Sequence, residues 1–388
     1  MTDNNCTDDE QMNTVNAQRN LPLDVLRGMT VALMIIVNLP GDYQNTYDAL
    51  KHAHWHGFTL ADFVFPSFLF VVGNSMAFSF HKHFDVPKVR LLRKVLRRTV
   101  ILFGLGLLLN FFPFYRFENG HWIAVNLFDI RFWGVLQRIA VCYGLASVLV
   151  LYIREKYLIA CCLSVLALYW VVIRIFSGTP DAYGLETLSN NVVTRVDLMF
   201  LPSRNIYQAY GVAFDPEGLL SSFPAAVNVV AGYLAARVVR LLSVRSSTWV
   251  LAVCGVGLLG FALTIEQFIP INKPLWTSSY VLYATGWDLM LLSAMIVVLE
   301  ILNLRRWTYF FEVLGRNPIF VFVMSVIGVY VLALLSGMNL VFTSAFFSDS
   351  FVRFAGAKNA SLIFSTLYLM GLWAIAWVLD RKKIFIKI

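Results

Sequence analysis

The sequence has little charge for its length. Only 14% of its 388 residues are Asp, Glu, Lys or Arg, whereas a water-soluble domain carries about 25%. Hydrophobic residues make up 59% and aromatic residues 15%. A long chain with so few charges cannot cover a water-facing surface, which excludes a soluble globular enzyme, a disordered chain and a collagen-like fibre. The apolar segments are continuous rather than alternating, which also excludes a membrane β-barrel.

Cysteine is scarce and follows no pattern. Of the five cysteines, one lies in a polar tail and four lie in apolar runs: Cys6, Cys142, Cys161, Cys162 and Cys254. No Cys-x-x-Cys pair occurs, so neither a disulfide framework nor a zinc site is predicted. The first 20 residues are polar and lack the order of a cleavable signal peptide. We therefore expect the first apolar segment to remain in place as a helix.

Long apolar runs are the main positive feature. Windows of about 20 residues predict ten membrane spans, at residues 24–40, 61–80, 95–112, 132–152, 157–176, 217–236, 249–267, 278–301, 313–335 and 360–379. The predicted fold class is therefore an all-α integral membrane protein with about ten transmembrane helices. We expect two parts, a polar cytoplasmic N-terminal tail (1–22) and one transmembrane domain (23–388).

The net charge of +8 is mostly a topology signal. Ten spans place both termini on one side. On that side fall 20 of the 31 Lys and Arg residues, against nine on the other. Cytoplasmic loops carry the excess of positive charge, so both termini are predicted to be cytoplasmic. Anionic membrane lipid, and not nucleic acid, is the expected partner of these basic residues.

The most informative cluster lies at the predicted non-cytoplasmic face. It reads HAHWHGFTLADFVFP and contains His52, His54, Trp55, His56 and Asp62. A histidine can take or give a proton near neutral pH, and an adjacent carboxylate can orient the imidazole. The alternating histidines match no zinc signature. The cluster therefore predicts proton transfer, and no metal is expected.

Three further groups are candidates because charge inside or beside a bilayer is costly. Gln137 and Arg138 lie in the fourth predicted span, where Arg138 pairs with Asp288 or Asp62 or binds an anion. Arg316 and Asn317 open the ninth predicted span, where a helix N-terminus suits phosphate and lipid contact is the alternative. Asp215 and Glu217 lie at the far-side mouth of the sixth span; they either cap that helix or bind the ammonium of an amino sugar.

Six segments in order resemble the heparan-α-glucosaminide N-acetyltransferase family of transmembrane acyltransferases. They are LDVLRGMTVALMIIVN (23–38), HAHWHGFTLADFVFPSFLFVVGNS (52–75), GVLQRIAVCYG (134–144), FDPEGLLSS (214–222), IPINKPLWTSSYVLYATG (269–286) and LGRNPIFVF (314–322). Together they extend over nearly the whole chain. Six ordered motifs are a specific signal, whereas any one of them alone is weak.

The resemblance implies transfer of an acetyl group from cytoplasmic acetyl-CoA to an amine on the far side. It implies that His52, ahead of Trp55, is the catalytic residue and that Asn38 corresponds to the family's asparagine at the end of the first core helix. We expect Asp62 to assist, with the cofactor near Gln137, Arg138, Arg316 and Asn317. The acceptor, glucosamine or a terminal glucosaminide, is expected near Trp55, His56, Asp215, Glu217 and Asp288.

Three points stay open at this stage. His52 either deprotonates the amine for direct attack, which we favour, or forms an acetyl-imidazole. A transporter of amino sugars is the alternative function. Since only a short polar segment precedes the first span, we expect a bacterial inner membrane with the site facing the periplasm, or an organelle membrane in a eukaryote; the resemblance is compatible with a homodimer.

Overall fold

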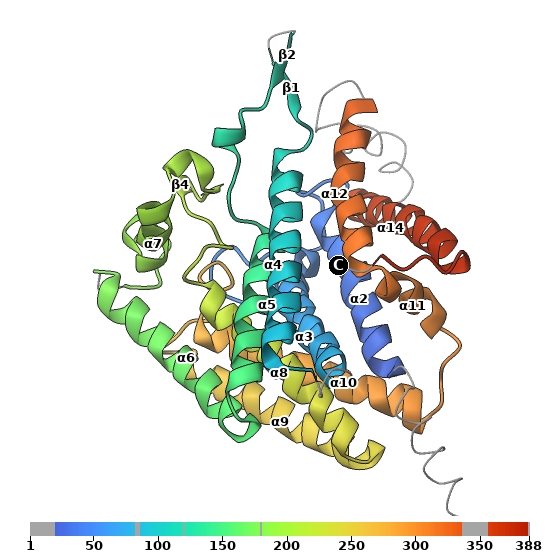
Figure 1. The fold of residues 1–388 in the computed structure, drawn as a ribbon. Helices are drawn as coiled ribbons and strands as arrows, with labels where there is room; N and C mark the ends of the chain where they lie inside the picture. The colour runs from blue at the N-terminus through green and yellow to red at the C-terminus, as the bar shows by residue number, and fades with distance from the viewer. Residues whose placement is uncertain (1–19, 82–85, 119–120, 179–180, 336–355, 387–388) are drawn as a thin grey trace, which may run out of the picture.

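The computed structural model describes residues 20–81, 86–118, 121–178, 181–335 and 356–386. In these residues the chain forms twelve α-helices and two short hairpins (Figure 1). The helices are α2 (Leu21–Asn38), α3 (Leu60–His81), α4 (Lys88–Phe111), α5 (Val135–Tyr152), α6 (Glu155–Phe176), α7 (Val192–Phe200), α8 (Ser222–Leu241), α9 (Val244–Ile265), α10 (Ser278–Ile296), α11 (Thr308–Arg316), α12 (Pro318–Leu335) and α14 (Ala357–Arg381).

The prediction of a helical protein with several membrane spans is confirmed. Eight described helices are long and apolar enough to cross a membrane, namely α2, α3, α5, α6, α8, α9, α10 and α14. A ninth candidate joins α11 and α12, which meet at 83°. The bend falls at Asn317, whose backbone leaves the helical region just before Pro318. The count of ten spans and the orientation of the termini are not confirmed.

Two predicted spans differ from the helices that form. The span at 95–112 lies within α4, which begins earlier, at Lys88, and carries six Lys and Arg residues in its first three turns. This charge lowers the mean hydropathy of α4 below that of the eight candidates. The predicted tail lies outside the described residues as far as residue 19. Residues 336–355, between the last two predicted spans, lie outside them as well.

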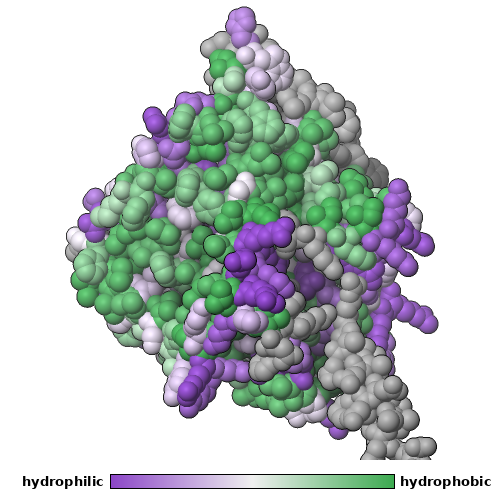
Figure 2. Space-filling view, viewed as in Figure 1, coloured by the Kyte–Doolittle hydropathy of each residue, from purple (hydrophilic) through white to green (hydrophobic). Residues whose placement is uncertain are grey.

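Four helices form the centre of the bundle. In α2, α3, α8 and α10, 61% of the most apolar stretch is buried, against 28% in α6 and α14 and 17% in α9. The outer helices turn their apolar side chains outward, and Figure 2 shows these side chains over much of the middle of one face. Such a surface suits contact with lipid chains.

Reciprocal glycines bring α3 and α8 close together. A Cβ atom on Gly73 would collide with the backbone of Val229 in α8, and one on Gly232 would collide with the backbone of Phe70 in α3. Small residues allow membrane helices to approach in this way. The contact fixes α3 at the centre of the bundle, and the first turn of α3 carries Asp62.

The long connections gather at one end of the bundle, uppermost in Figure 1. One connection contains the antiparallel hairpin of β1 (Tyr115–Glu118) and β2 (His121–Ala124). Another contains α7 and the hairpin of β3 (Gln208–Ala209) and β4 (Val212–Ala213). The two connections are joined, because Phe132 N–H donates to the carbonyl of Asn205 over 2.9 Å.

Candidate active site

Asp62 organises the connection between α2 and α3. Its side chain is buried, and its Oδ2 accepts hydrogen bonds from the N–H of Ala53 at 3.0 Å and from the N–H and hydroxyl of Thr59 at 3.2 and 3.0 Å. The other oxygen, Oδ1, lies 2.8 Å from Nδ1 of His52. These bonds fold the segment before α3 back onto the start of that helix. His52 is therefore held by the carboxylate that the sequence placed ten residues later.

The imidazole of His52 contacts Asp62 through Nδ1 and is partly exposed to solvent. Its side chain is 43% exposed, whereas that of Asp62 is 2% exposed. When Nδ1–H donates to Asp62, the lone pair of the neutral ring lies on Nε2. A buried carboxylate that fixes the tautomer in this way is the arrangement a general base needs.

Lys273 completes this group, and the sequence analysis did not select it. Its Nζ lies 3.4 Å from Oδ1 of Asp62 and 3.1 and 3.5 Å from Nδ1 and Nε2 of His52. Burial lowers the pKa of Lys273, and the carboxylate of Asp62 opposes that effect. The only available signal was its place in the segment IPINKPLW, because its sequence distance from His52 conceals the contact.

Asn272 holds Lys273 against the histidine segment. Its side-chain amide donates to the carbonyl of Trp55 over 3.0 Å, and its Oδ1 accepts the N–H of Leu275 over 2.8 Å. The adjacent Ile271 carbonyl accepts the N–H of Gly57 over 2.9 Å. The two loops are therefore joined through backbone groups, which fixes the lysine relative to His52.

The other members of the histidine segment have different surroundings. Trp55 is 6% exposed and donates its indole N–H to the carbonyl of Tyr183 over 2.7 Å. His56 Nδ1 lies 3.3 Å from the amide of Asn272, and burial lowers the pKa of His56. In the described parts of the chain, no three His, Cys, Asp or Glu side chains are arranged to hold a metal ion.

Asp215 and Glu217 both pair with Arg131. The guanidinium contacts Asp215 through Nε at 2.8 Å and Nη2 at 2.6 Å, and its Nη2 also contacts Glu217. Burial opposes these charges, but the two acids raise the pKa of Arg131 and the arginine lowers the pKa of Asp215. The backbone around Asp215 forms a turn, so α8 begins at Ser222, five residues after the predicted start.

Arg138 is buried away from both predicted acidic partners. It donates to the carbonyl of Gly218 over 3.2 Å and to Ser221, and its guanidinium lies 4.7 Å from the ring centre of Trp276. No ion pair joins it to Asp62 or Asp288 within the described residues. These contacts tie α5 to the start of α8.

The side chains of three more predicted residues make no described hydrogen bond or ion pair with Arg138. Gln137 donates to the carbonyl of Phe132 over 3.2 Å. Asp288 is fully buried in α10 beside Ser67 of α3. Asn38 ends α2 and is exposed.

Arg316 and Asn317 anchor the C-terminal segment. Arg316 pairs with Glu312 at 3.1 Å and with Asp380 at 2.5 Å. Asn317 donates its amide to the carbonyl of Ile384 over 3.1 Å and accepts the N–H of Ile386 over 2.8 Å. No described contact joins this pair to Gln137 or Arg138. The four residues expected near the cofactor therefore do not form one cluster.

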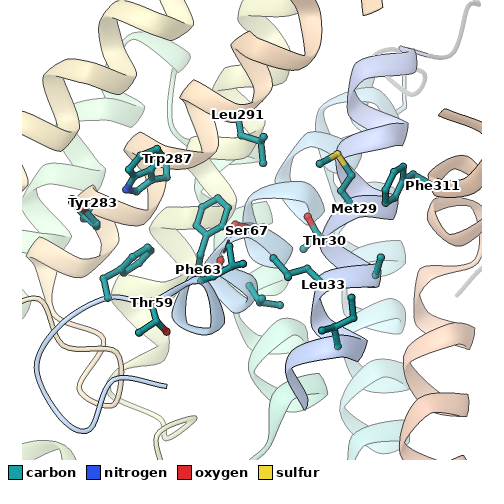
Figure 3. A pocket seen from close by; sticks show the side chains of 15 residues that line it. Met29, Thr30, Leu33, Thr59, Phe63, Ser67, Tyr283, Trp287, Leu291 and Phe311 are labelled. Carbon is teal, nitrogen blue, oxygen red and sulfur yellow. Dashed lines mark hydrogen bonds between the residues drawn. The ribbon is translucent and has the colours of Figure 1, made fainter. Parts of the chain in front are cut away.

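An apolar cavity of about 630 Å³ lies between α2, α3, α10 and α11 (Figure 3). Leu33 of α2, Phe63 of α3 and Trp287 of α10 face it, and Phe311 contributes from α11. Thr59 also lines it, and the hydroxyl of Thr59 donates to Asp62. The cavity therefore extends from the helices of the bundle to a residue in direct contact with the His52 site.

Comparison with known proteins gives concordant results. A family model described as heparan-alpha-glucosaminide N-acetyltransferase, catalytic, matches residues 19–203. The human protein named heparan-alpha-glucosaminide N-acetyltransferase is 28% identical to this chain. The alignment covers 94% of this chain and 59% of the human one. The mouse protein of the same name is 27% identical, with coverage of 96% and 61%. The family resemblance is confirmed.

The chain is thus similar to heparan-α-glucosaminide N-acetyltransferases over nearly all its length. It spans about three fifths of the length of these curated relatives. The match to the family model contains His52, Asp62 and Arg138. Lys273 and Arg316 lie beyond that match. That Lys273 contacts His52 and that Arg316 pairs with Glu312 and Asp380 is known from the structure alone.

Proposed function

We propose that this chain is a multi-pass membrane acetyltransferase. It moves an acetyl group from acetyl-CoA to the amine of glucosamine or of a terminal glucosaminide, with His52 as the catalytic residue. The observation that carries the proposal is the His52–Asp62 pair beside an apolar cavity. The names of the human and mouse relatives support the same activity.

The proposed chemistry uses three side chains. His52 Nε2 accepts the proton of the acceptor amine, and Asp62 stabilises the imidazolium that forms. The amine nitrogen bonds to the acetyl carbon, the bond from that carbon to sulfur breaks, and the departing CoA thiolate takes the proton from the His52 imidazolium. The Lys273 ammonium lies beside the imidazole and stabilises the negative charge that develops on the acetyl oxygen. Asn38 is proposed to donate a second hydrogen bond there.

The cavity fits the thin part of the acetyl donor. Bound acetyl-CoA supplies a thioester, which the chain of its pantetheine arm must carry to His52. The lining of aliphatic and aromatic side chains suits such an arm, and Thr59, which donates to Asp62, is part of that lining. We propose that the rest of the cofactor is bound by polar or basic side chains, and Gln137, Arg138, Arg316 and Asn317 are the candidates. Arg316 already pairs with two carboxylates, which reduces the charge it offers.

The remaining assignments complete the proposal. The acceptor lies near Trp55, His56 and Glu217, with the buried Asp215 and Asp288 as further candidates. Residues 23–388 form one transmembrane domain with ten spans, and both termini face the cytoplasm. In a bacterium the chain resides in the inner membrane and the site faces the periplasm. Direct transfer is favoured over an acetyl-imidazole, and ping-pong kinetics with a trapped acetylated His52 would reverse that preference.

The decisive experiment compares two histidine variants in nanodiscs. Labelled acetyl-CoA and glucosamine are incubated with the wild type, His52→Ala and the matched control His54→Ala, whose imidazole is also exposed. Wild type and the control should release CoA and form N-acetylglucosamine, and His52→Ala should form none. Glucosamine uptake into proteoliposomes without acetyl-CoA, together with no product, would favour the transporter instead.

A second experiment tests the cavity. Leu33→Trp fills the space between α2 and α10, so it should raise the KM for acetyl-CoA about tenfold or more. The matched control is Cys254→Trp, which fills a separate apolar cavity of about 470 Å³ beside α9. An equal effect of both variants would reject this cavity as the donor site.

A further inference from the structure

The tip of the β3–β4 hairpin has an unusual backbone for the residue it carries. Tyr210 and Gly211 form the turn, and both have positive φ, 55° and 79°. A two-residue hairpin turn with both φ values positive is normally built from Asn-Gly or Gly-Gly, because a side chain with a Cβ is disfavoured there. A large aromatic residue at the first position adds strain, and such strain persists mainly at binding and active sites.

The Tyr210 ring lies beside the candidate active site. It contacts Trp55 edge to face, with ring centres 5.2 Å apart. Trp55 is only three residues from His52 and is itself fixed by Tyr183 and Asn272. Burial raises the pKa of Tyr210, as does the negative charge of Asp62. The ring therefore contacts the segment that carries His52, although it comes from a distant part of the chain.

The Tyr210 ring is nevertheless open to solvent. Tyr210 is 46% exposed, and two other exposed tyrosines, Tyr43 and Tyr207, are close enough to contribute to its raised pKa. Arg131 covers Tyr207 at 4.5 Å from its ring centre. The hairpin is held at its base, where Phe214 N–H donates to the carbonyl of Tyr207 over 2.9 Å. The result is an exposed aromatic ring in contact with Trp55, three residues from His52.

We propose that Tyr210 is the platform on which the pyranose ring of the acceptor stacks, so that it determines selection of a cyclic amino sugar over an open-chain amine. The apolar C–H face of a pyranose packs on an aromatic ring, as ligands commonly do in pockets with aromatic walls. The amine then extends toward His52. This assignment rests on the proposed function, because it names the residue that recognises the acceptor of that reaction.

The test removes the ring without disturbing the turn. Tyr210→Asn places at this position a residue that accepts positive φ, and Tyr210→Phe keeps the ring. The matched control is Tyr115→Asn, which removes another exposed tyrosine, from the β1–β2 hairpin. Each variant is assayed with glucosamine and with 2-amino-1,3-propanediol, an amine with hydroxyls and no ring.

Tyr210→Asn should raise the KM for glucosamine about tenfold and leave kcat and the rate with the open-chain amine within twofold. Tyr210→Phe and Tyr115→Asn should resemble the wild type. Thermal unfolding should show that Tyr210→Asn is as stable as the wild type. An unchanged KM for glucosamine in Tyr210→Asn would overturn the assignment while leaving the acetyltransferase intact.

A binding measurement separates this assignment from the proposed function. Saturation-transfer NMR of glucosamine with the wild type, without acetyl-CoA, should show contact at ring protons, and Tyr210→Asn should lose it. Binding that depends on Tyr210 in a protein that transfers no acetyl group would reject the proposed function and keep the platform. Binding that persists in Tyr210→Asn, or no binding by the wild type, would reject the platform.

Discussion

Two charged clusters lie in the long connections of this protein, and they differ in what they leave open. In one, Asp62 contacts both His52 and Lys273, and the imidazole stays 43% exposed. In the other, Arg131 contacts both Asp215 and Glu217, and Asp215 is completely buried. Each has three ionisable side chains. Only the first presents an accessible ring nitrogen that can take a proton.

The difference separates a reactive group from a structural one. Arg131 stays protonated, and its two acids raise its pKa further. It can join the connection between α4 and α5 to the residues just before α8, but it cannot exchange a proton. The exposed ring nitrogen of His52 can accept a proton, which a guanidinium cannot do. We therefore expect substitutions in the first cluster to lower kcat, and substitutions in the second to lower stability or the affinity for the acceptor while kcat is kept.

Asp62→Asn should have the largest effect on activity. The amide keeps the shape of the side chain but no longer fixes the tautomer of His52 or stabilises its positive charge, so kcat should fall by about 10²–10⁴. Steady-state kinetics with glucosamine measures this loss. The companion variant Asp215→Asn should keep kcat within about threefold. Equal losses in both variants would remove the distinction between the clusters.

Arg131→Met should have the largest effect on stability. It leaves two carboxylates facing each other without their cation, one of them fully buried, which costs about 3 kcal/mol. Thermal unfolding in detergent should show a clear fall in Tm, while kcat per folded molecule stays near that of the wild type. A loss of kcat with unchanged Tm would assign Arg131 to the active site instead.

Lys273→Met should lower kcat by about 10- to 100-fold, because it removes one of several groups that stabilise the developing oxyanion. Lys273→Arg keeps the positive charge and should recover part of that loss. The unfolding temperature should change little, because Asp62 keeps its hydrogen bonds to Ala53 and Thr59. Wild-type kinetics in Lys273→Met would show that the lysine does not stabilise the oxyanion.

Asp197 should give the smallest effect, seen in the pH dependence of stability. Burial raises its pKa to about 6, and nearby Asp215 adds to this. Between pH 3.8 and about pH 6, Asp197 holds more protons in the folded chain than in the unfolded chain. The free energy of unfolding therefore falls as pH rises through that window. The loss should be roughly 1–3 kcal/mol. Asp197→Asn should flatten the Tm profile between pH 4 and 7.

The positions of the helices were predicted well because the membrane limits what a backbone can do. A segment that crosses lipid must satisfy its own hydrogen bonds and must present apolar side chains. Both requirements are visible in a single run such as 61–80, which corresponds to α3. Prediction was weaker where charge interrupts the pattern, as in α4, and where Asn317 divides one apolar run into two helices at 83°.

Part of the candidate site could also be found in the sequence. His52 and Asp62 lie ten residues apart, on either side of a turn and at the start of an apolar run, so their contact is local. Lys273 could not be placed beside them, since 221 residues separate it from His52. The partner of Asp215 was missed for the same reason, because Arg131 lies 84 residues away.

The sequence by itself determined that the chain is helical and apolar, and it supplied a histidine and an acid near one helix end. Those properties depend on composition and on neighbours along the chain. The tertiary structure alone decided which charges neutralise one another and which remain available, because that outcome depends on distances between segments. It brought Lys273 to His52 and the Tyr210 hairpin to Trp55, and it paired Arg131 with its two acids. The free energy of a charge in a protein is set by the groups within a few ångströms of it, and a sequence does not list them.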